Sequence, residues 1–421
     1  MAPRLPCLTS DCLLHVFLNL DPVSILRCAA VSRHWRRAVI DNASEIRRHP
    51  GRHLLLGIYH REMYPGKLAF SHRSSWLPPS DGPHWWDSLP APSHVPVVEG
   101  TTPKLCSPLA CSDGFILVCR GLASEMCVYN PFTGFSASIP RLGELVTYNY
   151  VLHSCHGVEP NPSPNTFQVL AVKIERHGIL DLQNYCSKGG AWGPVFRPNA
   201  SRLRMPYSEN IQPCYKYLAA PVLYRGAIHW LCSDVSDYDS SQYRQLRFDK
   251  ITRIVAVDIS TGQARMTRLP NHLLMDNHDV STKKRLMLAT SSEGERLSLL
   301  RTEKSGLEVA IWLYDGDHGD DDNDDVEKRW VLSRSVDIRK LIEDAGLAYF
   351  RPSCKDWAVL ETRLEWFCPR SNRLIIWVPF LGLFVLDLVS MEIQRAVGDS
   401  YGHMWPYEID LTLFFSLKPF E

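Results

Sequence analysis

The sequence of 421 residues lacks an excess of either charge, because 46 lysines and arginines balance 46 aspartates and glutamates. A protein dedicated to nucleic acid or to an anionic membrane surface would carry a basic excess. We therefore expect neither nucleic acid nor a membrane as a partner. The hydrophobic fraction of 45% and the charged fraction of 22% are typical of globular proteins. The length predicts two domains.

The sequence also lacks a recognisable export signal or membrane span. Asp11 and His15 interrupt the first apolar stretch, and no small-residue cleavage site follows it. The most apolar run, 374–389, contains Pro379 and Gly382, which favours two short strands around a turn. We expect a cytoplasmic or nuclear protein whose 13 cysteines are reduced thiols.

Motifs for catalysis and cofactor binding are missing as well. The sequence contains no G-x-S-x-G elbow, no P-loop and no G-x-G-x-x-G fingerprint. No cysteine has a recognisable activating context, and the zinc-binding cysteines of a RING domain are absent. We therefore expect no catalytic residue and no cofactor.

Metal-binding patterns fail on spacing. No C-x-x-C pair occurs, and no clusters of cysteine and histidine stand at zinc-finger spacing. The acidic run 315–325 lacks the glycine and the glutamate that an EF-hand loop needs at its sixth and twelfth positions. We expect no metal ligands, and we interpret the acidic run as a solvated hairpin loop.

What the sequence does contain begins with a helical pattern. Thr9 or Ser10 can cap a helix that begins near Asp11, and apolar residues then recur at helical spacing. Asp21-Pro22 is a signal for a second helix over 23–30, because aspartate suits the N-cap and proline suits the first helical position.

Two further helices are expected before Pro50-Gly51. Ser32 can cap a third helix, and Asn42 with Glu45 resembles a capping box for a last helical turn. So few residues cannot bury all of their apolar side chains among themselves. The remaining apolar surface either binds a partner or packs on the rest of the chain, and the spacing alone leaves both alternatives open.

The segment 8–41 resembles an F-box. The matching positions are Leu8, Asp11, Leu13, Leu14, Val16, Phe17, Leu20, Asp21, Pro22, Leu26, Val31, Arg33, Trp35 and Arg36. F-box motifs dock on a Skp-type adaptor, which links them to a cullin scaffold in SCF ubiquitin ligases. The sequence departs from the family at Thr9, where proline is usual, and at Ser32, where cysteine is usual.

The resemblance implies that the apolar face of these helices binds the Skp-type adaptor. The expected contact residues are Leu8, Leu13, Leu14, Val16, Phe17, Leu20, Pro22, Leu26, Val31 and Trp35. A basic face is formed by Arg33, Arg36, Arg37, Arg47 and Arg48. This face is either only solvated, or assists docking by charge complementarity, or touches nucleic acid.

After Pro50 the helical periodicity gives way to short runs of β-branched and aromatic residues between turn residues. Many short strands with frequent turns predict an all-β sandwich, barrel or propeller. The candidate strands are 115–119, 167–174, 227–232, 254–259, 296–300, 309–314, 374–378 and 384–388.

A weak internal repeat favours the propeller. Asn130, Asp258 and Asp387 each follow a short strand and begin a tight turn, and they are spaced by 128 and 129 residues. A third of this interval gives a blade of about 43 residues, and half of it also works if the loops are long. We therefore predict six to eight blades.

These segments resemble the F-box-associated β-propeller domains of large plant families, most closely at 112–119, 224–232, 291–300 and 309–315. We divide the chain into an F-box helical module (1–50), an irregular segment rich in Pro, Ser and Trp (51–108) and a β-propeller-like target-binding domain (109–421). Residues 180–213 are expected to form a long loop.

Both resemblances imply a substrate-recognition subunit of an SCF-type E3 ubiquitin ligase. The F-box would dock on the Skp-type adaptor, and the propeller would bind the target protein. We expect a non-catalytic adaptor subunit. Two alternatives stay open, namely an adaptor-binding protein that acts outside a ligase and a propeller enzyme with an unrelated helical cap.

Overall fold

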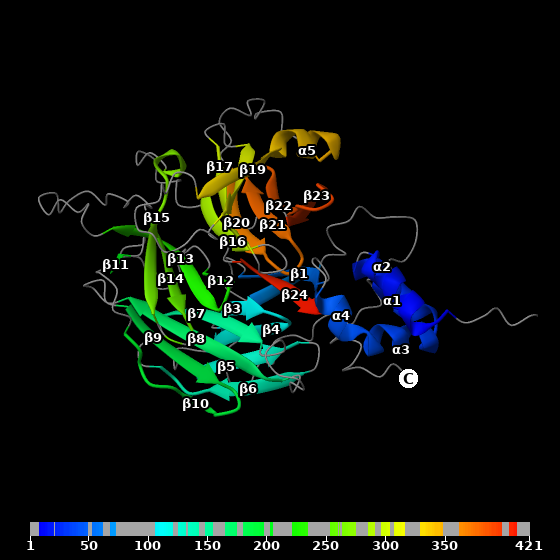
Figure 1. Cartoon of the computed structure of the whole chain (residues 1–421), viewed down its shortest axis with the longest axis horizontal. Coiled ribbons are helices and arrows are strands. Elements are labelled where there is room, and N and C mark those ends of the chain that lie inside the picture. Colours follow the sequence, from blue (N-terminus) through cyan, green and yellow to red (C-terminus); the bar gives the residue numbers. More distant parts are fainter. Residues whose placement is uncertain are drawn as a thin grey trace, which may run out of the picture.

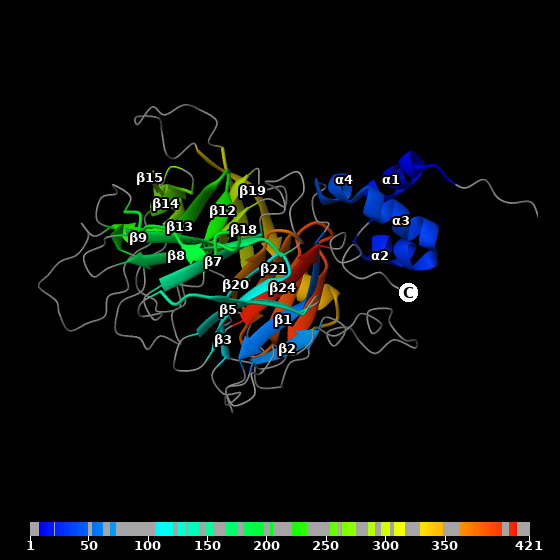
Figure 2. The ribbon, with the colours of Figure 1, turned by 90° about the horizontal axis from the view of Figure 1, so that it is seen from below.

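The computed structural model separates a group of four helices from a larger set of β-sheets (Figures 1 and 2). The structure describes residues 8–20, 22–48, 53–61, 68–72, 106–120, 125–131, 134–142, 148–154, 165–174, 180–197, 203–204, 221–234, 253–259, 261, 263–274, 285–290, 296–303, 307–315, 329–347, 362–397 and 404–410. No helix within these residues is long and apolar enough to cross a membrane.

The four N-terminal helices confirm the helical prediction. They are α1 (Ser10–Leu18), α2 (Pro22–Val31), α3 (Arg33–Asp41) and α4 (Ala43–Arg48). Pro22 stands at the first helical position of α2, where its missing N–H has no intrahelical partner to lose. We call residues 8–48 the helical module.

Five antiparallel sheets follow one another along the chain, and each forms a blade. The first consists of β3 (Cys106–Ser112), β4 (Phe115–Arg120), β5 (Glu125–Asn130) and β6 (Phe135–Ile139). The second consists of β7 (Tyr148–Ser154), β8 (Phe167–Ile174), β9 (Leu180–Cys186) and β10 (Ala191–Trp192).

The third blade has five strands, β11 (Leu203–Arg204), β12 (Val222–Tyr224), β13 (Ala227–Asp234), β14 (Arg253–Asp258) and β15 (Ala264–Arg268). A 3₁₀ turn, η7 (Asn271–Leu273), follows it. The fourth blade consists of β16 (Leu286–Thr290), β17 (Leu297–Thr302), β18 (Glu308–Tyr314) and β19 (Trp330–Asp337). Helix α5 (Ile338–Asp344) leads to the fifth blade, with β20 (Arg363–Cys368), β21 (Arg373–Val378), β22 (Gly382–Asp387) and β23 (Ile393–Val397).

A further sheet of three strands closes the ring. Its order is β2 (Leu68–His72), β1 (His53–Arg61) and β24 (Met404–Asp410), so a strand from each end of the β-rich region pairs with the other. Strand β24 contacts β3 of the first blade and β20 of the fifth. We call β1, β2 and β24 the closing sheet. The chain therefore folds as a helical module followed by a large all-β propeller.

The predicted number of six to eight blades is wrong. Among the residues that the structure describes, five sheets form four- or five-stranded blades, and the closing sheet has only three strands. Asn130, Asp258 and Asp387 lie in the first, third and fifth blades, so each interval of the repeat spans two blades. Dividing the interval by three fails because the described strands of the third blade lie far apart in sequence: β11 ends at residue 204 and β12 begins at 222, and β13 ends at 234 and β14 begins at 253.

The turns of the repeat are nevertheless real. Each joins the last two strands of its blade. The Asp258 carboxylate accepts a hydrogen bond from the Thr261 backbone N–H at 2.7 Å, and the Asp387 carboxylate accepts one from that of Val389 at 2.9 Å. An aspartate that bonds the backbone a few residues ahead stabilises a tight turn.

The eight candidate strands all coincide with observed strands, but two other predictions differ from the structure. Residues 180–213 are not a single loop, because β9 occupies 180–186 and pairs with β8 along its length. Its partly alternating pattern of apolar and polar residues is typical of a strand. Residues 53–61 and 68–72 of the predicted irregular segment are also strands. The tryptophan-rich part of that segment and residues 316–325 of the acidic run lie outside the described residues.

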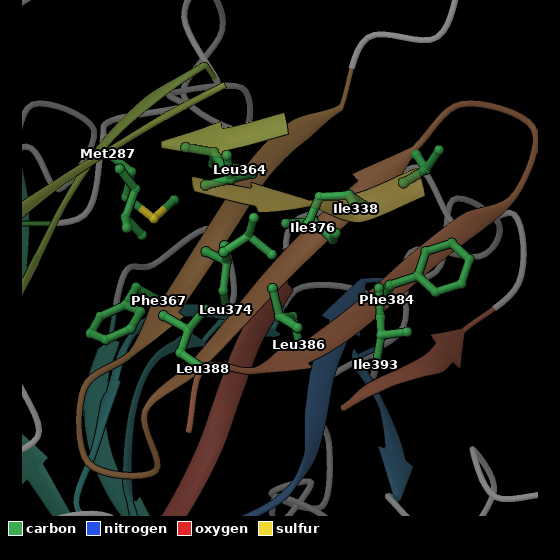
Figure 3. Close-up of a cluster of buried hydrophobic side chains, with 14 of the residues drawn as sticks. Met287, Ile338, Leu364, Phe367, Leu374, Ile376, Phe384, Leu386, Leu388 and Ile393 are labelled. Atoms are coloured by element: carbon green, nitrogen blue, oxygen red, sulfur yellow. The ribbon is translucent and has the colours of Figure 1, made fainter. Parts of the chain in front are cut away.

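The core of the propeller lies between neighbouring blades. Figure 3 shows the cluster that joins the fourth and fifth blades with α5. Its labelled members are Met287, Ile338, Leu364, Phe367, Leu374, Ile376, Phe384, Leu386, Leu388 and Ile393. Apolar surface removed from water contributes about 25 cal/mol per Å², so each blade is stabilised mainly by the next one.

Candidate docking surface

Two side-chain caps define the starts of helices in the helical module. The Thr9 hydroxyl accepts a hydrogen bond from the backbone N–H of Cys12 at 3.4 Å, and the Ser32 hydroxyl accepts one from that of Trp35 at 3.3 Å. Each bond satisfies an N–H that has no partner within its helix. The two positions where this chain departs from the usual F-box residues therefore both serve as helix caps.

The end of α3 is tied to the start of α1 through the side chain of Asn42. The Asn42 side-chain amide donates to the Ala38 carbonyl at 2.8 Å and to the Ser10 hydroxyl at 3.1 Å. The Arg36 guanidinium donates to the Ala29 carbonyl at 3.3 Å and so links α3 to α2. These bonds fix the relative positions of three short helices.

The interior of the module is fully apolar. Its buried side chains are Leu13, Phe17, Ile25, Ala29, Ala38, Val39 and Ile46. The Trp35 ring meets the Phe17 ring edge to face, with 5.9 Å between the centroids. Such aromatic pairs add to the stabilisation that burial gives.

The predicted adaptor-contact residues fall into distinct groups. Leu8 is 49% exposed and Val31 is 73% exposed, so both present apolar surface to solvent. Leu13 and Phe17 are fully buried and hold the module together from within. Leu14, Val16, Leu20 and Trp35 are half-buried, and the side chains of Pro22 and Leu26 lie outside the described residues. The candidate docking surface therefore consists of Leu8 and Val31 with the half-buried residues.

The helical module also packs on the propeller. Its interior forms one continuous apolar cluster with Leu56 and Tyr59 of β1 and with Tyr407 and Ile409 of β24. Helix α2 contacts β1. Packing on the rest of the chain, one of the two alternatives that the sequence left open, is therefore observed for part of the apolar surface, and another part is exposed.

Sequence patterns missed a polar cluster beside this junction. The Glu408 carboxylate of β24 accepts a hydrogen bond from the Ser371 backbone N–H at 2.6 Å, and the Tyr407 hydroxyl donates to the Gly114 carbonyl at 2.8 Å. The Arg370 Nε lies 3.3 Å from the Asp113 Oδ1. We call these six residues, which connect the first blade, the closing sheet and the fifth blade, the closure cluster.

Burial dominates the electrostatics of the closure cluster. It raises the pKa of the Glu408 carboxyl, and the hydrogen bonds from Ser371 offset this effect only in part. Asp113 raises the same pKa and Arg370 lowers it. Only the Asp113-Gly114 dipeptide, a typical hairpin turn, could have indicated part of this cluster from the sequence.

The chemistry of the closure cluster is that of a structural contact. Glu408 is committed to Ser371, and Asp113 faces Arg370. Within the described residues, no group of three or more His, Cys, Asp or Glu side chains is arranged to hold a metal ion. The exposed apolar residues of the helical module are therefore the better candidate for a functional surface.

Two family models match the chain. The F-box domain model matches residues 5–46, and a model described as a domain of unknown function, DUF7595, matches residues 89–414. The first covers the helical module, and the second covers the five blades. No curated protein matches the chain.

Solved structures with similar chain paths share little sequence with this protein. A putative TolB from Agrobacterium tumefaciens is 11% identical, with a TM-score of 0.33 over 84% of this chain and 97% of its own. An oligogalacturonate lyase in complex with manganese is 11% identical, with a TM-score of 0.34 over 84% and 87%. The Dos1 propeller is 11% identical, with a TM-score of 0.31 over 69% of this chain and 58% of its own. Similarities at this level carry no functional argument.

Proposed function

The chain belongs to the DUF7595 family and carries an F-box domain ahead of the family's domain, and on this basis we propose that it is the substrate-recognition subunit of an SCF-type E3 ubiquitin ligase. The observation that carries the proposal is an F-box whose apolar residues Leu8 and Val31 face solvent. F-box domains in general bind Skp-type adaptors, and a cullin scaffold would be reached through that adaptor. The propeller would bind a target protein.

In this proposal the chain catalyses no step itself. It holds the target beside a charged ubiquitin-conjugating enzyme, which turns a bimolecular encounter into a nearly intramolecular one. Such an adaptor works in the cytoplasm or nucleus and leads to ubiquitination and degradation of the target. The cluster shared by the helical module and the closing sheet supports this proposal, because it joins the propeller, which would hold the target, to the helices that carry the docking surface.

The docking surface is tested by changing its exposed residues. We expect Leu8→Asp combined with Val31→Asp to lower the affinity for a Skp-type adaptor by about thirtyfold or more, because a buried charge replaces apolar contact. Both side chains are exposed in the free protein, so the fold should be unaffected. Affinity is measured by titration of purified full-length chain with the adaptor, and folding by circular dichroism.

Val389→Asp is the matched control, because Val389 is 74% exposed and lies in the fifth blade. It should bind the adaptor like the unmodified chain. Phe17 is unsuitable for this test because it is fully buried, so its substitution would disrupt the module itself. Undiminished binding by the folded double variant would contradict the proposed surface.

A second function, adaptor binding outside a ligase, shares the same docking surface. The two are separated by cullin association and by target turnover in cells. A ligase subunit should co-purify with the cullin through the adaptor, and its loss should lengthen the lifetime of at least one captured protein. Adaptor binding without either effect would favour the second function.

A further inference from the structure

The outer strands of the third blade differ in charge from those of the other blades. Strands β14 and β15 carry three arginines, Arg253, Arg265 and Arg268, against one carboxylate, Asp258. In each of the other four blades, the last two strands carry at least as many carboxylates as arginines. The third blade therefore carries a local positive charge on a chain that has no net charge.

Two of these arginines stand directly opposite each other. Arg253 pairs with Arg268 across β14 and β15, so both side chains leave the same face of the sheet. The Cβ atoms of such a pair are about 5 Å apart. Arg253 is half-buried and Arg268 is exposed. Because like charges at opposite positions destabilise a sheet, the stability of the blade does not account for this pair.

The arginine pair lies on the side of the third blade that faces the second blade. Val255 is two positions after Arg253 and so shares its face, and it belongs to the same buried cluster as Leu182 of the second blade. Leu182 pairs with Phe196, whose ring is therefore on the same face and is 40% exposed. The junction between these two blades, which are neighbours in Figure 1, is bordered by the arginine pair and by an exposed aromatic ring.

We propose that Arg253 and Arg268 form a docking surface for an acidic segment of the target protein, an inference that rests on the proposed function. A guanidinium binds a carboxylate through two parallel N–H bonds. Two guanidiniums side by side therefore match two carboxylates that are close together in a peptide. The bound carboxylates would also offset the repulsion between the arginines, which a neutral segment would not do.

The surroundings of the arginine pair favour a protein segment over other anionic partners. A binder of nucleic acid or of an anionic membrane carries a broad basic excess, whereas 46 basic residues balance 46 acidic ones in this chain. Among the outer strand pairs of the five blades, only β14 and β15 have more arginines than carboxylates. The ring of Phe196 adds apolar contact beside the charges, which matches an acidic peptide that also has apolar side chains.

Binding is measured by fluorescence anisotropy with the full-length chain and a labelled peptide of alternating glutamate and leucine residues. In an extended peptide of this pattern all glutamates lie on one face. We expect this peptide to bind, and a peptide with glutamine in place of every glutamate to bind about tenfold more weakly or worse. Sodium chloride should weaken the binding of the acidic peptide, because salt screens exposed charges.

Arg268→Gln should weaken binding of the acidic peptide about tenfold, and adding Arg253→Gln should weaken it further. Arg265→Gln is the matched control, because Arg265 is an exposed arginine on the same strand but lies opposite Ala256, on the other face. It should bind the peptide within about twofold of the original chain. The thermal midpoint of Arg268→Gln should stay within about 2 °C of the original or rise, since a repulsion is removed.

Equal weakening by Arg265→Gln would overturn the docking surface, because binding would then follow net charge and not the arginine pair. Failure of the acidic peptide to bind would also overturn it, as would a fall of several degrees in the thermal midpoint of Arg268→Gln, which would make the pair structural. Arg268-dependent binding of single-stranded DNA, or of vesicles of phosphatidylcholine and phosphatidylserine, in preference to the peptide would overturn it in favour of another partner.

This test is independent of adaptor binding. If the chain binds no Skp-type adaptor while Arg268-dependent peptide binding persists, the ligase role fails and the arginine pair remains an acidic-peptide site. If the adaptor binds and the peptide does not, the docking surface fails and the ligase role stands.

Discussion

The side-chain hydrogen bonds described in the helical module span 3 to 32 positions of sequence, whereas the contacts that close the propeller join the two ends of the β-rich region. Thr9 bonds Cys12, and Ser32 bonds Trp35. In contrast, the Tyr407 hydroxyl bonds the Gly114 carbonyl, 293 residues away in sequence. The helix starts of the module therefore depend on local signals, and the propeller needs nearly the whole chain. We therefore predict that a destabilising substitution in the module affects mainly the module, whereas one in the ring affects several blades.

Phe17→Ala should give the largest effect. Phe17 is fully buried and contacts Trp35, so its loss should destabilise the helical module by about 3–5 kcal/mol. Hydrogen exchange should show faster exchange in α1 to α3 and unchanged exchange in β21 and β22. Leu8→Ala, at an exposed position, serves as the control and should change stability by less than about 0.5 kcal/mol. If β21 and β22 lost as much protection from hydrogen exchange as α1 to α3, this contrast between the module and the ring would be wrong.

Glu408→Gln should change how the stability of the ring depends on pH. Because burial raises the pKa of Glu408 in the folded protein, the folded state binds a proton more tightly than the unfolded state. Stability is then full below the ordinary glutamate pKa of 4.5 and falls as the pH rises toward the raised value. The glutamine variant keeps an oxygen for the Ser371 N–H but has no proton to lose.

The expected difference between the two proteins approaches a slope of about 1.4 kcal/mol per pH unit within that window. Denaturant unfolding from pH 4 to pH 8 measures it. Among the groups near Glu408, Asp113 raises the pKa of its carboxyl and Arg370 lowers it. Glu408 in turn raises the pKa of the Cys111 and Cys368 thiols. If the stability of both proteins changed with pH in the same way, Glu408 would not control the pH dependence of the ring's stability.

Ser32→Ala should have the smallest effect. It removes the hydroxyl that caps α3 and should cost about 1 kcal/mol. Exchange of the first amides of α3 would report the loss. Ser32→Asn restores an acceptor and should recover most of it, whereas an equally large loss with asparagine would mean that the hydroxyl acts other than as a cap.

The sequence predicted what depends on neighbouring residues. Helix starts follow from Thr9 and Ser32 because a cap bonds a backbone N–H only three positions away. The turns at Asp258 and Asp387 were found for the same reason. The docking residues could be placed on helices, but the spacing of apolar residues did not separate buried Phe17 from exposed Val31.

The closure cluster and the number of blades could not be predicted in this way. Glu408 and Ser371 belong to different sheets, and no shared pattern marks either residue as the partner of the other. Halving the repeat interval, which the sequence left open for long loops, agrees with the two blades in each interval, but residue counts alone could not choose it over division by three. The pairing of β1 with β24 could not be predicted either, because the two strands lie at opposite ends of the β-rich region.

The pairing of β1 with β24 also determines when the propeller can close during synthesis. The helical module leaves the ribosome early with its local contacts already available, while β1 waits for a partner that is made some 350 residues later, as the pairing of Gly57 with Tyr407 requires. Until then one edge of β1 is unpaired, and an unpaired strand edge can pair with the wrong strand. A chain interrupted before Met404 would contain the helices of the proposed docking module, but it would lack a closed propeller and also Tyr407 and Ile409, on which the module packs. Under the proposed function, such a fragment would occupy the adaptor while presenting no target.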